Sequence, residues 1–85
     1  MTTTDPRAAI LDLLRAIAPE AATADLDPGA DLRDELDLDS MDLLTLIAGI
    51  ERELGVTVPE RDYGQVHTLD AAVDYVTARR GTSSR

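Results

Sequence analysis

Aliphatic side chains recur at helical spacing near both ends of this chain, and that period limits the folds open to it. Two sets of four residues fit the i, i+3, i+4, i+7 pattern, namely Ile10, Leu13, Leu14 and Ile17 in the first and Leu69, Ala72, Val73 and Val76 in the second. A third run rich in leucine and isoleucine lies between them, at residues 40–54. The chain has only two aromatic residues, both tyrosines, so these helices must pack through aliphatic side chains.

Residues that begin and end helices flank the first two segments. Asp5 and Pro6 predict a first helix over residues 6–18, because aspartate is a good N-cap and proline a good first helical residue. Pro19 ends it, since the residue before a proline disfavours the helical conformation.

The second helix is predicted over residues 40–54. Asp39 can cap its start, Asp42 lies three residues on in an arrangement related to the capping box, and Gly55 suits its C-terminal cap. Gly49 lies in its interior, where glycine costs about 1 kcal/mol relative to alanine, so a close contact is expected there.

The rest of the chain reads as one long connection and two further helices. The connection spans residues 19–38, and leucines at 26, 32, 36 and 38 should pack it into an ordered loop with room for one helical turn. Residues 56–58 alternate like a strand but are too short and lack a partner. A short helix over residues 59–63 should end at Gly64, and the last helix should begin after Thr68.

These elements predict an all-α fold, a small four-helix bundle with three main helices, one short helix and a long loop between the first two helices. The 85 residues suffice for a single domain, 1–85, in which we expect residues 1–4 and 81–85 to be flexible tails. We expect the protein to be a monomer.

Composition excludes several classes of function. The chain has no cysteine, so it has neither a thiolate metal site nor a cysteine nucleophile. Its net charge of −9 repels nucleic acid and anionic membranes and favours partners with basic patches. No apolar run is long enough to cross a membrane, and the first residues lack the basic and apolar regions of a signal peptide. We therefore expect a cytosolic protein with no membrane insertion.

The second helix carries two apolar stripes where a single core needs one. At about 100° per residue, the first stripe comprises Leu43, Leu46, Ile47, Ile50 and Leu54, and the second comprises Met41, Leu44 and Ala48. The two stripes cannot face the same core. The second one either packs beneath the long loop or forms an exposed surface that a partner covers.

Ser40, between two acidic residues at the start of this helix, has three interpretations. A nucleophilic serine needs a base, and the only histidine, His67, lies in a polar stretch before the last helix; no G-x-S-x-G motif surrounds the serine. A second possibility is that Asp39 and Ser40 only cap the helix. The third is a modification site, because a phosphodiester at a helix N-terminus gains from free N–H groups and the helix dipole.

The acidic residues around Ser40 do not fit a calcium loop. The calcium-loop template requires glycine at its sixth position and glutamate at its twelfth. Counted from Asp37, these positions hold Asp42 and Ala48, and counted from Asp25 they hold Ala30 and Leu36. We therefore predict no metal site.

Three segments together resemble a bacterial acyl carrier protein of the stand-alone, phosphopantetheine-binding kind. Residues 36–42 read Leu-Asp-Leu-Asp-Ser-Met-Asp, like the family's attachment motif. Residues 50–59 are similar to its helix end and hydrophobic-Pro step, and residues 68–76 to its last helix. The resemblance covers about residues 6–80.

The resemblance implies a four-helix carrier in place of an enzyme. It implies 4′-phosphopantetheine, transferred from coenzyme A to Ser40 by a phosphopantetheinyl transferase, with Asp39 beside the attachment point. Acyl groups would be held as thioesters on the arm and presented to acyltransferase, ketosynthase or acyl-ligase enzymes of fatty-acid, polyketide or related biosynthesis. The implied partner surface comprises Asp39, Met41, Asp42, Leu44, Ala48 and Glu51.

Several positions depart from the family pattern. Asp37 stands where a glycine is frequent, Leu32 where an aromatic is frequent, and Met41 where leucine is usual. Thr45 and Arg52 fall where carriers of fatty-acid synthesis often have acids. A carrier dedicated to a specialised acyl pathway therefore competes with a housekeeping one.

Two further questions stay open at this point. The residues Leu46, Ile50, Leu54, Tyr63 and Val66 are candidates to line an acyl groove, whose alternative is a closed core. The same arm could serve an aminoacyl or peptidyl carrier, and an unmodified acidic helical adaptor could use the same exposed stripe.

Overall fold

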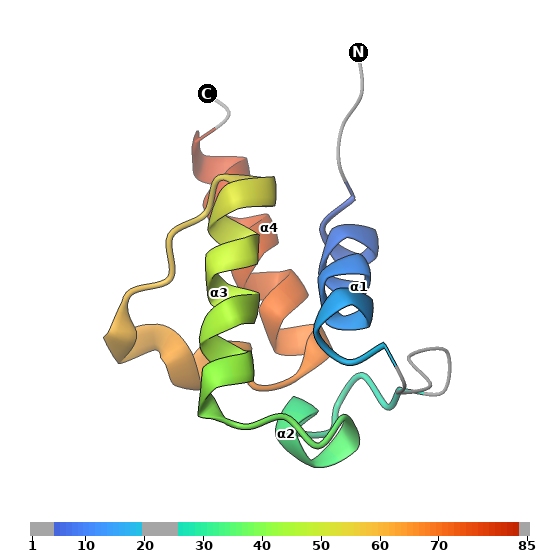
Figure 1. Cartoon of the computed structure of the whole chain (residues 1–85). Helices are drawn as coiled ribbons and strands as arrows, with labels where there is room; N and C mark the ends of the chain where they lie inside the picture. The colour runs from blue at the N-terminus through green and yellow to red at the C-terminus, as the bar shows by residue number, and fades with distance from the viewer. Residues whose placement is uncertain (1–4, 20–25, 84–85) are drawn as a thin grey trace.

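The computed structural model describes residues 5–19 and 26–83, and helices make up most of them (Figure 1). In chain order the elements are α1 (Pro6–Ile17), α2 (Leu32–Glu35), α3 (Ser40–Leu54), the 3₁₀ helix η2 (Glu60–Val66) and α4 (Leu69–Ser83). The described part of the chain has no strand, only an isolated bridge between Asp31 and Thr68. The predicted all-α fold is confirmed.

Helix α1 begins at Pro6, as predicted, and ends at Ile17, one residue before the predicted end. Asp5 occupies the N-cap in an extended conformation, but its side chain makes no capping hydrogen bond, so the pre-set φ of Pro6 defines the start. At the other end the Ala18 amide donates to the Leu14 carbonyl at 2.8 Å. Ile10 and Leu14 are fully buried and fix which face of α1 turns inward.

Helix α3 has its predicted bounds. Asp39 accepts from the amide of Asp42, and the Asp42 side chain accepts from the amide of Asp39, which completes a capping box. Gly55 ends the helix in the left-handed region at φ 70°, where glycine is least strained. The apolar stripe from Leu43 to Leu54 is buried, as predicted.

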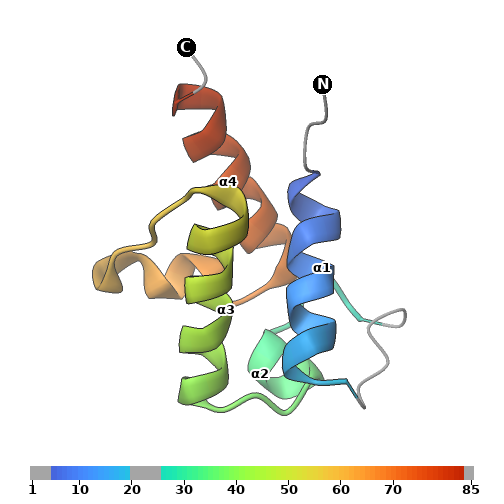
Figure 2. The same ribbon diagram turned by 45° about the horizontal axis from the view of Figure 1, so that its top comes forward.

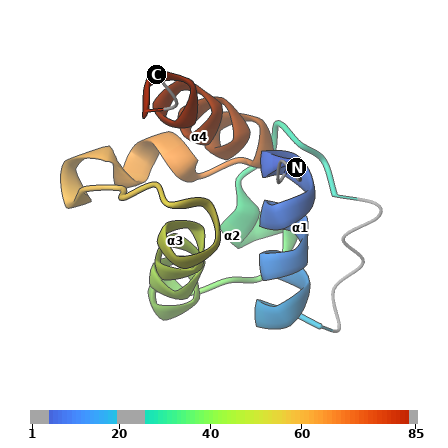
Figure 3. The same ribbon diagram turned by 90° about the horizontal axis from the view of Figure 1, so that it is seen from above.

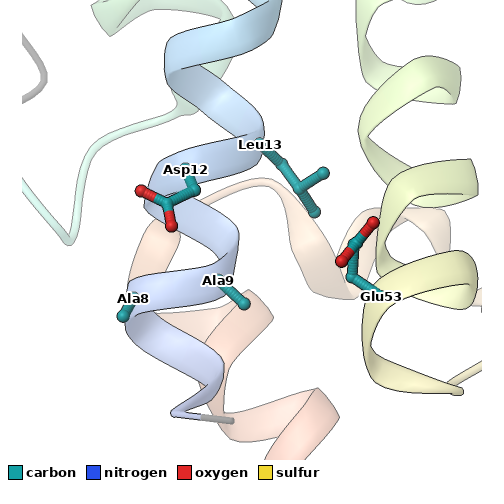
Figure 4. Close-up of a pocket in the computed structure, with 5 residues that line it drawn as sticks. All are labelled: Ala8, Ala9, Asp12, Leu13 and Glu53. Atoms are coloured by element: carbon teal, nitrogen blue, oxygen red, sulfur yellow. The ribbon is translucent and has the colours of Figure 1, made fainter.

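Helices α1 and α3 lie side by side (Figure 2), and they pack closely at Gly49. A Cβ at this position would lie 2.6 Å from Cδ2 of Leu13, so the absent side chain is what admits Leu13 to the surface of α3. Figure 4 shows Leu13 pointing from α1 toward α3. The expected close contact at Gly49 is confirmed.

A shallow pocket of about 330 Å³ lies beside this contact, lined by Ala8, Ala9, Asp12, Leu13 and Glu53 (Figure 4). Glu53 is thirteen residues along α3 from Ser40, which at the helical rise corresponds to about 20 Å. The pocket therefore belongs to the opposite end of α3 from the serine.

The connection between α1 and α3 is held by its leucines. Leu32, Leu36 and Leu38 are buried and Leu26 is half-buried, and α2 supplies the single helical turn that the sequence allowed. Two backbone bonds tie this connection to the start of α4, from the Leu32 amide to the His67 carbonyl at 2.7 Å and from the Asp70 amide to the Pro28 carbonyl at 2.9 Å. Residues 20–25 of the predicted loop lie outside the described residues.

The last two helices differ from prediction at their ends. The short helix is a 3₁₀ helix that continues through Gly64 to Val66, because Val66 is drawn fully into the core. Helix α4 starts after Thr68, whose hydroxyl accepts from the Ala71 amide at 3.0 Å, as predicted. It runs to Ser83, so residues 81–83 are helical where a tail was expected, and the view from above shows η2 alongside α4 (Figure 3).

Candidate attachment site and recognition surface

Ser40 is the first residue of α3, and its side chain is exposed. Figures 1 and 2 place this helix start at the end of the molecule that also holds α2. The hydroxyl therefore lies at the surface and at the positive end of a four-turn helix. This is the location that a modification site requires.

The capping box shapes the immediate surroundings of Ser40. The Asp42 amide donates to Asp39 Oδ1 at 2.8 Å, and the Asp39 amide donates to Asp42 Oδ2 at 3.3 Å. These bonds use the amides of Asp39 and Asp42. The amides of Ser40 and Met41, which lie between them in sequence, take no part in the capping box. Donors at the N-terminus of a helix favour a negatively charged group, so this end of α3 suits a phosphodiester on Ser40.

Asp37 adopts a left-handed backbone conformation, with φ 56°, just before the serine. An L-residue with a Cβ is strained there, and aspartate tolerates it better than most because its short side chain can bond locally. The adjacent Leu38 amide donates to the Arg33 carbonyl at 3.1 Å and closes the turn. This left-handed conformation is the physical reason why glycine suits the position.

The second apolar stripe of α3 is exposed. Met41 has 69% and Leu44 43% of its surface accessible, and Ala48 is also exposed. The alternative in which the stripe packs beneath the long loop is therefore wrong. The stripe starts next to Ser40 and follows α3 toward its C-terminal half.

Charged side chains border this stripe. Asp39 and Glu51 are exposed and Asp42 is half-buried, so each of the three carboxylates can be reached from solvent. Glu51 accepts a hydrogen bond from the Thr57 hydroxyl at 3.2 Å. Arg52, the basic residue that departs from the family pattern, pairs with Glu53 at 3.0 Å, which partly neutralises it.

Further acidic groups lie on the connection that leads to Ser40. The Arg33 backbone amide donates to Asp31 at 2.9 Å, and with the Arg33 side chain it lowers the pKa of that carboxyl below its ordinary value. Asp34 and Glu35 are exposed beside it. Within residues 5–19 and 26–83, no three histidine or acidic side chains converge as a metal site would require.

The five acyl-groove candidates all belong to the core region. Leu46, Ile50, Leu54 and Val66 are buried, and Tyr63 is half-buried against them.

His67 is half-buried, and its backbone carbonyl accepts a hydrogen bond from the Leu32 amide. No helix within the described residues is long and apolar enough to span a membrane.

Comparison with known proteins agrees with this geometry. Residues 8–76 match the family described as "Phosphopantetheine attachment site". The chain is 36% identical to the acyl carrier protein of Rubrobacter xylanophilus over 53 residues, which is 62% of this chain and 65% of that protein. It is 32% identical to the acyl carrier protein of Myxococcus xanthus over 54 residues, 64% of this chain and 68% of that protein.

A eukaryotic relative shows the same likeness over a smaller share of its length. The mitochondrial acyl carrier protein of Neurospora crassa is 34% identical over 50 residues, 59% of this chain and 37% of that protein. The chain thus spans less than two thirds of the Neurospora and Rubrobacter proteins. The family match covers most of the chain and includes the exposed serine at the start of α3, so the chain belongs to the phosphopantetheine attachment site family.

Proposed function

We propose that this protein is an acyl carrier, in which Ser40 holds a 4′-phosphopantetheine arm derived from coenzyme A. The observation that carries the proposal is an exposed serine at the first position of α3, inside a match to the phosphopantetheine attachment family. The arm supplies a thiol, which this chain lacks because it has no cysteine, and acyl groups are held on that thiol as thioesters.

The attachment reaction uses Ser40 as the acceptor. Its Oγ forms a bond to the phosphorus that bears pantetheine in coenzyme A, the bond from that phosphorus to the bridging oxygen breaks, and adenosine 3′,5′-bisphosphate leaves. The hydroxyl proton passes to a base of the transferase. The protein contributes an accessible hydroxyl and the two amides outside the capping box, and we assign it no catalytic step of its own.

The exposed stripe serves as the surface that partner enzymes recognise. Met41, Leu44 and Ala48 offer apolar contact next to the arm, and Asp39, Asp42 and Glu51 offer charge to basic patches on a partner. The proposed partners are a phosphopantetheinyl transferase and enzymes that load or process acyl groups, of acyltransferase, ketosynthase or acyl-ligase type. The proposed compartment is the cytosol.

Intact-mass measurement tests the attachment. Incubation with coenzyme A and a broad-specificity transferase should increase the mass by one phosphopantetheinyl group. Ser40→Ala should abolish the increase. Thr45→Ala, which removes another exposed hydroxyl from the same helix, should leave it unchanged.

The same experiment separates the carrier from an unmodified adaptor. A chain that stays unmodified under these conditions, while a known carrier in the same tube is modified, would contradict the proposal. Once the holo protein is in hand, the enzyme class that loads it decides between acyl and aminoacyl cargo. Loading by an amino-acid-activating enzyme and not by an acyl-transferring one would overturn the acyl assignment.

A further inference from the structure

Asp62, on η2, is a buried charged residue with only 8% of its surface exposed. Its Oδ2 accepts hydrogen bonds from the Tyr75 hydroxyl at 2.7 Å and from Arg79 Nη2 at 3.2 Å. Its Oδ1 accepts from Gln65 Nε2 at 3.2 Å, with Arg61 Nε 4.0 Å away. Two of these donors, on Tyr75 and Arg79, belong to α4, so the carboxylate joins one helix to the other.

The donors on α4 are themselves held in place. Tyr75 and Arg79 are four residues apart and share a face of the helix, and the guanidinium lies 4.6 Å from the centre of the Tyr75 ring. The ring is buried, with 7% of its surface exposed. Loss of one of these donors while η2 stays packed on α4 would leave a buried carboxylate short of a partner, which is more costly than the loss of an exposed ion pair.

Helix η2 depends on this attachment for its position. Its 3₁₀ hydrogen bonds have poorer geometry than those of an α-helix, so it has little stability of its own. Among the helices, η2 packs most closely against α4, and α3 packs most closely against α1 (Figure 3). Val66 of η2 and Leu46 of α3 are both fully buried and belong to the same hydrophobic core.

We propose that the Asp62 cluster, defined as Asp62, Gln65, Tyr75 and Arg79, is a latch that holds η2 on α4 and thereby controls whether the core between η2 and α3 admits an acyl chain. With the latch closed, Val66 stays packed in the core. With the latch released, η2 keeps only its apolar anchor and moves away from α3 more often. The acyl part of this inference rests on the proposed function, and the latch itself does not.

Amide hydrogen exchange of the unmodified full-length protein tests the latch. Tyr75→Phe removes one hydroxyl and keeps the ring, and Asp62→Asn removes the charge. Both should lower the protection of the amides of residues 62–66 by about tenfold or more, because each removes a hydrogen bond to a buried charged group. The amides of α1 and α3 should change much less.

Arg61→Gln is the matched control, since Arg61 lies on the same helix and is largely exposed. It should leave the protection of η2 unchanged. An equal loss of protection in every helix of the Tyr75→Phe protein would show a merely general contribution to stability and would overturn the latch. So would unchanged protection of η2 in both cluster variants.

A second measurement addresses the acyl chain. Methyl NMR shifts of Leu46, Ile50 and Val66 are compared between holo and octanoyl-loaded forms, in the original protein and in Tyr75→Phe. The variant should show the larger shifts, and equal shifts would overturn control of the core by the latch. Failure of Ser40 to accept the arm would instead contradict the proposed function, and the exchange result would still stand or fall by itself.

Discussion

At the scale of single residues, backbone strain is concentrated at Asp37, two positions before the capping residue of α3. Its positive φ is needed for the turn that delivers the chain from α2 to Ser40. Elsewhere in the described chain, the positive φ at Gly55 belongs to a glycine. The strain at Asp37 is therefore open to relief by substitution.

We predict that Asp37→Gly raises the free energy of unfolding by up to about 1 kcal/mol, because glycine adopts the left-handed region without a Cβ penalty. Asp34→Gly is the control: Asp34 is exposed and helical in α2, where glycine should cost about 0.5–1 kcal/mol. Urea unfolding followed by circular dichroism measures both. Equal destabilisation by the two changes would contradict the assigned strain.

Tyr75 provides a second prediction, in its titration. Burial, followed by its hydrogen bond to Asp62, raises the pKa of the Tyr75 hydroxyl above its ordinary value of 10.0. The Tyr63→Phe protein keeps Tyr75 as its only tyrosine, and alkaline titration of its ultraviolet absorbance should have a midpoint above that value.

The same shift predicts how stability changes at high pH. The folded state favours the neutral Tyr75 hydroxyl, so this hydroxyl contributes to the free energy of unfolding. The contribution is fully present below about pH 10 and is lost as the pH rises through the pKa of Tyr75 in the folded state. Tyr75→Phe should remove this part of the alkaline loss. A midpoint at or below that of free tyrosine would refute both statements.

At the scale of elements, locally set helix ends were predictable and ends set by tertiary contacts were not. Pro6, Asp39 and Gly55 act on their own turns, so the start of α1 and both bounds of α3 followed from the sequence. Helix η2 continues past Gly64 because Val66 and Asp62 are held by other elements, which no local pattern reveals.

In the candidate site, too, features set by the local sequence were predictable and features set by tertiary contacts were not. Helical periodicity predicted the second stripe of α3, because both stripes could not face one core, but it left open whether that stripe packs beneath the long loop or is exposed. The left-handed turn at Asp37 and the Asp62 cluster depend on how distant segments meet. The spacing of Tyr75 and Arg79 was the only local sign of the cluster.

The contact between α1 and α3 leads to a prediction for Gly49. Replacement of Gly49 by alanine should add about 1 kcal/mol to the free energy of unfolding through helix propensity. In the original protein the clash with Leu13 should cancel this gain. In a Leu13→Ala background the clash is gone, so Gly49→Ala should be more favourable there by about 1 kcal/mol or more. A double-mutant cycle in urea measures the difference. Identical effects of Gly49→Ala in the two backgrounds would rule out the contact.

At the scale of the whole molecule, the fold and the proposed recognition surface use different sides of α3. Leu46 and Ile50 are fully buried, whereas Leu44 is exposed. We therefore predict that Leu44→Glu changes the free energy of unfolding by no more than about 0.5 kcal/mol. It should nevertheless slow modification of Ser40 by a transferase, because it places a charge in the apolar stripe.

Thr77→Glu adds the same charge to an exposed position of α4 and is the matched control. Transferase kinetics and thermal melts of both variants provide the comparison. Similar rates for the two variants would remove Leu44 from the recognition surface. A lower melting temperature for Leu44→Glu alone would assign it to the fold.

The capping box has a consequence for how the folded chain tolerates attachment of an arm. Asp39 and Asp42 close the start of α3 without help from the Ser40 hydroxyl, so attachment of an arm breaks none of their bonds. We expect unmodified and modified forms to differ in free energy of unfolding by less than about 1 kcal/mol, the usual scale of a charge at a helix end, as paired thermal melts would show. A larger gap would mean that the arm packs into the fold. With matched stabilities, the arm can be attached or removed without changing how firmly the chain is folded.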